Sequence, residues 1–102
     1  MSDAKLYDTP SIRTISEVIS ELRNVLIRKN KDYDDSAFQP PLLNPTATAE
    51  SGILTRMSDK ISRIRNLLQN TASVDEALED TVLDLAGYAV IFLANRRLQK
   101  NS

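Results

Sequence analysis

One carboxylate lies in a stretch of sequence that is otherwise almost entirely apolar. Asp84 is the only charged residue between Thr81 and Asn95. A carboxylate in apolar surroundings is unfavourable unless a group of opposite charge pairs with it. Helical spacing places Asp80, Asp84 and Tyr88 on one ridge, four residues apart. Two carboxylates one turn apart suit an oxygen-coordinated divalent ion, and the same pair suits basic side chains equally well.

A second segment supplies the opposite charge. Its charged residues recur at spacings of three and four, so they share one helix face: Arg56, Asp59, Lys60 and Arg63. Three cations and one carboxylate on a single helix edge could face Asp80 and Asp84 and hold phosphate oxygens, with a metal bridging to the acids. The alternative is a solvated face stabilised by pairs such as Asp59 with Arg63. For Asp84 the alternative is a structural ion pair.

The irregular segment 31–49, which precedes the basic segment, also carries acids and aromatic rings. Three of its acids resemble a calcium loop only in part, because the glycine and closing glutamate of such a loop are missing: Asp32, Asp34 and Asp35. The aromatic residues Tyr33, Phe38 and Tyr88 serve either packing or stacking on a base.

Composition excludes much familiar chemistry. The 102 residues contain no His, Cys or Trp. Disulfide scaffolds, thiol nucleophiles, Ser-His-Asp hydrolysis and histidine-ligated metals are therefore excluded, and any metal must be bound by oxygen, as Mg²⁺, Mn²⁺ or Ca²⁺ is. The 13 basic and 14 acidic residues give no basic excess for duplex nucleic acid. Without a long apolar run or a signal pattern, we expect no membrane association and a cytoplasmic location.

Hydrophobic periodicity predicts three helices and no strand, hence an all-α fold. The first helix begins at Thr9-Pro10, a hydroxyl cap followed by proline, and ends near Asn30. The second spans about 47–68. The third opens with the capping box of Ser73 and Glu76 and reaches the polar tail after Asn95. Prolines keep 31–49 irregular, and its apolar residues favour an ordered loop. We expect a flexible leader at 1–8 and one domain at 9–100.

The third helix is apolar nearly all round over 81–94. A helix without a polar face is buried on every side, and a chain of three helices can hardly enclose it alone. Self-association is the expected consequence.

Three segments together resemble a known family: KNKDYDDSAF, RMSDKISRIRNLL and DEALEDTVLDLAGYAVI. Over about residues 24–94 the chain resembles the phage and bacterial nucleotide modification associated domain of the first type, a distant relative of the MazG-like all-α NTP pyrophosphatases. The resemblance implies an all-α fold that assembles by helix packing between subunits, and a nucleotide ligand.

The resemblance also implies a metal arrangement that this sequence matches only in part. In the wider pyrophosphatase family, glutamates on one helix and a Glu-x-x-Asp pair on a later helix hold Mg²⁺. Asp84 matches the aspartate of the later pair, and Tyr88 follows at the family's spacing. Thr81 fills the glutamate's position, with Glu79 and Asp80 just before it. The earlier cluster is represented only by Asp59, which Lys60 follows.

Fewer carboxylates and more cations favour clasping phosphate over metal-assisted hydrolysis. We therefore predict a phage-type, oligomeric protein that sequesters a nucleotide or a nucleotide-derived, even cyclic, signal in the cytoplasm. The predicted ligand contacts are Arg56, Lys60, Arg63, Asp84, Tyr88, Lys31, Asp32, Tyr33 and Ser36. The predicted metal ligands, with Mg²⁺ as the ion, are Asp59, Glu79, Asp80 and Asp84. The alternatives are an Mg²⁺-dependent nucleoside triphosphate pyrophosphohydrolase and a helical interaction module without a small-molecule ligand.

Overall fold

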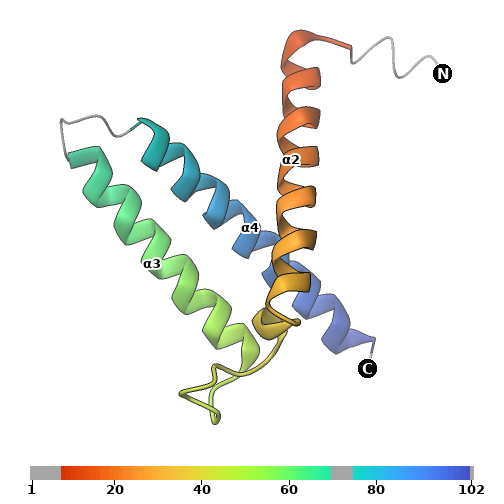
Figure 1. Cartoon of the computed structure of the whole chain (residues 1–102), viewed down its shortest axis with the longest axis vertical. Helices are drawn as coiled ribbons and strands as arrows, with labels where there is room; N and C mark the ends of the chain where they lie inside the picture. Colours follow the sequence, from red (N-terminus) through yellow and green to blue (C-terminus); the bar gives the residue numbers. More distant parts are fainter. Residues whose placement is uncertain (1–7, 70–74, 102) are drawn as a thin grey trace.

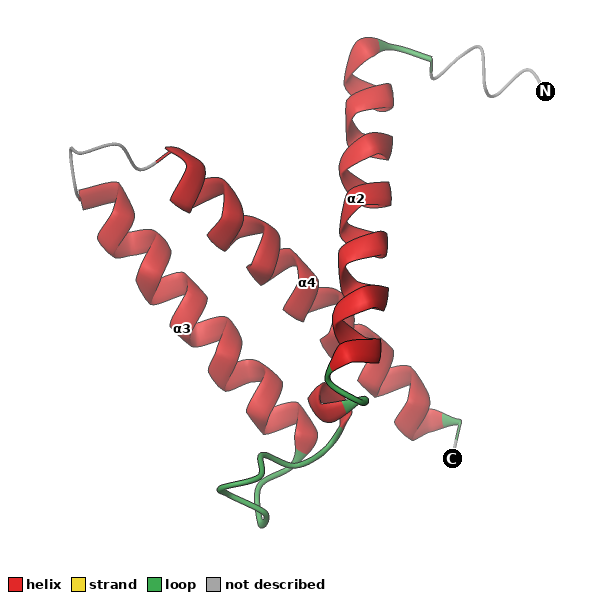
Figure 2. Cartoon of the chain, viewed as in Figure 1, coloured by secondary structure: helices red, strands yellow, loops and turns green. Residues whose placement is uncertain are grey.

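The computed structural model describes residues 8–69 and 75–101. Its elements, in chain order, are α2 (Pro10–Asp32), the single 3₁₀ turn η1 (Ser36–Phe38), α3 (Ala49–Gln69) and α4 (Asp75–Lys100). All regular structure in the described ranges is helical, so the predicted all-α fold is confirmed (Figure 2). No helix there is both long and apolar enough to span a membrane.

Helices α3 and α4 form an antiparallel hairpin, and α2 crosses α4 near the middle of α4 (Figure 1). The N-terminal half of α2 diverges from the hairpin. The result is a flat, open arrangement of 50 × 44 × 21 Å. Within the described ranges, Ile53 of α3 is the one apolar side chain that is buried, at 2% exposure.

The predicted start of α2 is confirmed. The Thr9 hydroxyl accepts a hydrogen bond from the Ile12 amide at 3.1 Å, and Pro10 occupies the first turn, where its missing N–H costs nothing. The helix runs two residues beyond the predicted end at Asn30. Lys29 and Lys31 lie in its last turn, where positive charge is favourable.

The loop after α2 begins with a reversal of the chain. Asp34 and Asp35 both take positive φ, 51° and 60°, a conformation that aspartate tolerates better than most residues. Hydrogen bonds from the amides of Ser36 and Phe38 to the carbonyls of Tyr33 and Asp35 then form η1. The 31–49 segment that was predicted to be irregular therefore also contains the end of α2 and this short turn.

The other boundaries differ little from the prediction. Helix α3 starts two residues later and ends one residue later than expected. Helix α4 continues through residues 96–100, because these are good helix formers and Arg97 and Lys100 suit a C-terminal turn. The predicted capping residue Ser73 and residues 1–7 of the predicted leader lie outside the described ranges. Asp8 forms a 2.6 Å ion pair with Arg13.

A single chain does not enclose α4. The buried residues of α4 are Thr81, Gly87 and Asn95, whereas Val82, Val90 and Leu93 are each about half exposed. The expectation that three helices cannot cover this apolar helix is therefore met.

Gly87 sets the closest approach of α2 to α4. A Cβ at this position would lie 2.9 Å from Cδ2 of Leu26 and 3.7 Å from Cδ1 of Leu22. The absence of a side chain at Gly87 lets these two leucines of α2 reach the backbone of α4.

We predict that Gly87→Leu pushes α2 away from α4 and lowers the free energy of unfolding by up to about 2 kcal/mol. Overpacking costs about 1–3 kcal/mol, and removal of a helical glycine returns about 1 kcal/mol. Denaturant unfolding at a fixed protein concentration measures the change. Val82→Leu, which places the same side chain on an exposed face of α4, is the control and leaves stability unchanged. A Gly87→Leu protein as stable as the wild type would contradict the packing described.

Candidate functional site

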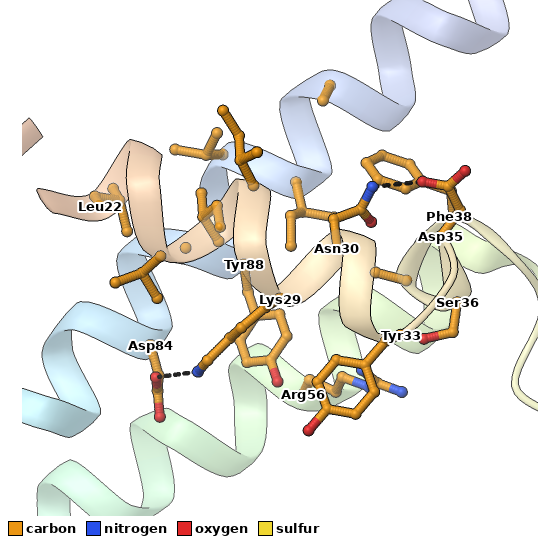
Figure 3. A pocket seen from close by; sticks show the side chains of 18 of the residues that line it. Leu22, Lys29, Asn30, Tyr33, Asp35, Ser36, Phe38, Arg56, Asp84 and Tyr88 are labelled. Carbon is orange, nitrogen blue, oxygen red and sulfur yellow. Dashed lines mark hydrogen bonds and ion pairs between the residues drawn. The ribbon is translucent and has the colours of Figure 1, made fainter. Parts of the chain in front are cut away.

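A pocket of about 890 Å³ lies where α2, η1, α3 and α4 meet (Figure 3). The C-terminal half of α2 and the middle of α4 supply an apolar wall, lined by Leu22, Val25, Leu26, Ile27, Leu83, Gly87, Val90, Ile91 and Ala94. The turn η1 adds Ala37 and Phe38. Polar side chains line the rest of it: Lys29, Asn30, Lys31, Tyr33, Asp34, Asp35, Ser36, Arg56, Lys60, Asp84 and Tyr88.

Asp84 joins three helices at one end of this pocket. Its Oδ2 lies 3.4 Å from Nζ of Lys60 on α3, and its Oδ1 lies 3.7 Å from Nζ of Lys29 on α2. Figure 3 shows the contact with Lys29. The Asp84 side chain remains 36% exposed. The predicted contact between Asp84 and a cation of the second helix is therefore present at Lys60, and α2 supplies another cation.

The next turn of the hairpin falls beyond the pocket. There, Nε of Arg63 donates a hydrogen bond to the Thr81 hydroxyl at 3.2 Å, and that hydroxyl donates to the Ala77 carbonyl at 2.7 Å. Because α3 and α4 run antiparallel, Arg63, three residues after Lys60, faces Thr81, three residues before Asp84. Arg63 therefore shares a face with Lys60 but is engaged outside the pocket.

The structure brings most of the predicted ligand contacts into one lining. Seven of the nine belong to it: Lys31, Tyr33, Ser36, Arg56, Lys60, Asp84 and Tyr88. Arg63 and Asp32 do not. The pocket therefore gathers residues from α2, η1, α3 and α4 that lie up to 57 positions apart in the sequence.

The predicted metal ligands are less concentrated. Asp84 lines the pocket, whereas Asp59, Glu79 and Asp80 are exposed and lie outside its lining. Over 8–69 and 75–101, no three carboxylates lie close enough together to hold a metal ion. The proposed Mg²⁺ site stays a prediction.

The loop acids have a structural role in the turn after α2. The Asn30 side-chain amide donates to Oδ1 of Asp35 (Figure 3), and the Asp35 amide donates to the Asn30 carbonyl at 3.2 Å. These bonds fasten the reversal at Asp34 and Asp35 to the end of α2. They also hold Tyr33 and Ser36 at the rim of the pocket.

Sequence reasoning missed Lys29 and Asn30. Lys29 follows Leu22 and Leu26 at spacings of seven and three, so it continues the ridge that faces α4. It also precedes Tyr33 by one turn. This spacing could have predicted that Lys29 faces α4. Which residue of α4 it contacts depends on how the two helices cross.

The fold and the pocket define a small all-α protein with a cation-lined site between helices. A family model described as "Nucleotide modification associated domain 1" matches residues 29–95, about two thirds of the chain. The chain belongs to this family. The match includes Lys29 and every polar residue of the pocket. No curated protein and no solved structure matches the chain significantly.

We predict that Asp84 and Lys60 stabilise each other by up to about 1 kcal/mol, the range of partly exposed ion pairs. A double-mutant cycle with Asp84→Asn and Lys60→Met measures this coupling by denaturant unfolding. Salt at 1 M weakens it, because the screening length falls to about 3 Å.

Asp80→Asn combined with Lys60→Met is the matched control, since exposed Asp80 lies one turn away from Asp84 on α4. This pair shows no coupling. Strictly additive effects for the Asp84 and Lys60 variants would argue against the contact in solution.

Proposed function

We propose that this pocket binds a nucleotide, or a nucleotide-derived signal that includes cyclic forms, and holds it without hydrolysis. The observation that supports this most directly is the meeting of cations from two helices with aromatic rings in one pocket. Lys29 comes from α2, and Arg56 and Lys60 come from α3. Tyr33 and Tyr88 complete the combination that a phosphorylated, ring-bearing ligand needs.

The cations are available for phosphate. No side chain in the described ranges pairs with Arg56, so its guanidinium can present two donors to phosphate oxygens. The contacts of Lys29 and Lys60 with Asp84, at 3.7 and 3.4 Å, are longer than the ~2.8 Å of a charge-assisted hydrogen bond. Either ammonium group can therefore turn toward a phosphate while Asp84 keeps it near the pocket.

The remainder of the pocket suits a base and a sugar. Its volume of about 890 Å³ lies in the ~300–1,000 Å³ range of small-molecule sites. The rings of Tyr33, Phe38 and Tyr88 line it beside aliphatic side chains of α2, among them Leu22 and Leu26. Stacking on such rings accepts any base, because every base has a π-face. Lys31 and Ser36 at the rim supply donors for ribose or base edges.

The distribution of acids favours holding over cutting. Phosphoryl hydrolysis needs metal ions that neutralise developing charge and position the water. The one acid among the helical residues of the lining is Asp84, and both of its oxygens face lysines. Asp34 and Asp35 belong to the turn after α2. A protein that holds a nucleotide unchanged can manage a nucleotide pool or withhold a signal of host defence, as a phage-type protein in the cytoplasm would.

We predict that Arg56→Ala weakens nucleotide binding at least tenfold. A hydrogen bond to a charged group contributes about 1.5–3 kcal/mol, and about 1.4 kcal/mol corresponds to a factor of ten. Isothermal titration calorimetry with ATP, AMP and a cyclic dinucleotide measures the affinities. Arg65→Ala is the matched control: it removes the same charge from an exposed position of α3 outside the lining, and affinity stays within twofold.

We expect that the same nucleotides, incubated with the protein and Mg²⁺, are recovered intact when they are analysed by ion-exchange chromatography. Release of pyrophosphate at a rate proportional to the protein concentration would establish the pyrophosphohydrolase instead. No heat of binding for any of the three compounds at millimolar concentration would leave only the interaction module.

A further inference from the structure

Asp84 occupies the place between Lys29 and Lys60 that an anionic group of a ligand would take. Its two carboxylate oxygens contact the two ammonium groups at 3.7 and 3.4 Å, one oxygen to each lysine (Figure 3). A phosphate group likewise presents several oxygens close together, so it meets the same two lysines. Asp84 therefore acts on a phosphate bound there as a like charge at close range.

The charges around Asp84 determine how much negative charge this part of the pocket neutralises. Arg56 lies one turn before Lys60 on the same face of α3 and, with Lys29 and Lys60, gives three cations against one carboxylate. The resulting excess of two positive charges matches a single phosphate monoester, which carries about two negative charges at neutral pH. A phosphodiester carries less charge and is also fully neutralised.

Elsewhere in the described lining, positive charge does not exceed negative charge. The end of α2 and the turn after it bring Lys31 together with two acids, Asp34 and Asp35, and all three side chains are exposed. The wall formed by α2 and α4 is apolar. The second and third phosphates of a longer chain therefore lie beside acids or against aliphatic side chains, and both surroundings are unfavourable for them.

Asp84 is also poorly placed to hold a metal ion that would neutralise a longer phosphate chain. Such an ion takes oxygen ligands, usually carboxylates and water. Both oxygens of Asp84 face lysines instead. The pocket therefore neutralises phosphate with cationic side chains, and their number limits the charge that it accepts.

We infer that the pocket selects nucleotides with a single phosphate group, open or cyclic, and that Asp84 sets this limit. The inference rests on the proposed nucleotide function of the same pocket. Repulsion by Asp84 increases with the charge of the phosphate chain, so it disfavours a triphosphate more than a monophosphate. A residue that only held the lysines in place would affect both ligands alike. The ratio of the two affinities separates these roles.

Titration calorimetry of the wild-type protein with AMP, 3′,5′-cyclic AMP and ATP tests the selectivity. The buffer contains EDTA, which removes the Mg²⁺ that would otherwise neutralise part of the charge of ATP. AMP and cyclic AMP each bind at least about tenfold more tightly than ATP. ATP binding as tightly as AMP overturns the inference and leaves the proposed function standing. No binding of any of the three compounds overturns both.

Asp84→Asn tests the role of Asp84, because it removes the charge at nearly constant side-chain volume. The preference for AMP over ATP falls at least about fivefold. Asp84→Glu keeps the charge and the preference. Glu76→Gln is the matched control, since it removes a charge from an exposed position two turns earlier on α4, about 12 Å away and beyond the ~8 Å screening length. It leaves the preference within twofold of the wild type.

Lys60→Met provides a second test that does not depend on the folding of Asp84→Asn. Removal of a cation costs ATP more than AMP, so the preference for AMP rises in this variant. Circular dichroism confirms that each variant is helical before its affinities are compared. A preference that stays the same in both variants, or both affinities falling equally in Asp84→Asn, assigns Asp84 to positioning alone and overturns the inference.

Discussion

The geometry of the site depends on the ion pairs that the Asp84 carboxylate forms with two lysines. Asp84 carries the only charge in the apolar middle of α4, and it is met by Lys60 from α3 and Lys29 from α2. All three side chains keep contact with water, so each pair stabilises the fold only modestly. The effect of these pairs is to hold two ammonium groups from different helices at one end of the pocket. Arg56 lies one turn before Lys60 on the same face of α3.

The crossing of α2 over α4 links this site to the open N-terminal half of α2. Gly87 lets α2 approach closely at Leu26, which brings Lys29 within reach of Asp84 three residues earlier on α4. The same crossing ends the contact between the helices, because α2 and α4 diverge beyond it. Gly87 therefore determines where α2 packs on α4 to form the apolar wall of the pocket, and the N-terminal half of α2 beyond this contact is left uncovered by α4.

The sequence was sufficient for the elements and for part of the site. Spacing of apolar residues located three helices to within a few residues, and Thr9-Pro10 located one start to the residue, because these signals are local. The unusual position of Asp84 predicted a cationic neighbour, which is Lys60. The partners of Lys29 and Arg63 could not be predicted, because they depend on the crossing of α2 and on the register of α3 against α4. Arg63 lies on the predicted face of α3 but one turn beyond the pocket, where its partner is Thr81.

The proposal of a nucleotide ligand rests on membership of the nucleotide modification associated domain 1 family and on the cationic, aromatic lining of the pocket. The most direct test maps that ligand by NMR, following backbone amide shifts of the ¹⁵N-labelled chain as ATP is added. The account predicts that saturable shifts concentrate at Lys29–Phe38, at Arg56 and Lys60, and around Asp84 and Tyr88. Shifts that are absent, or that gather at the exposed basic C-terminal end of α4 around Arg97, would contradict it.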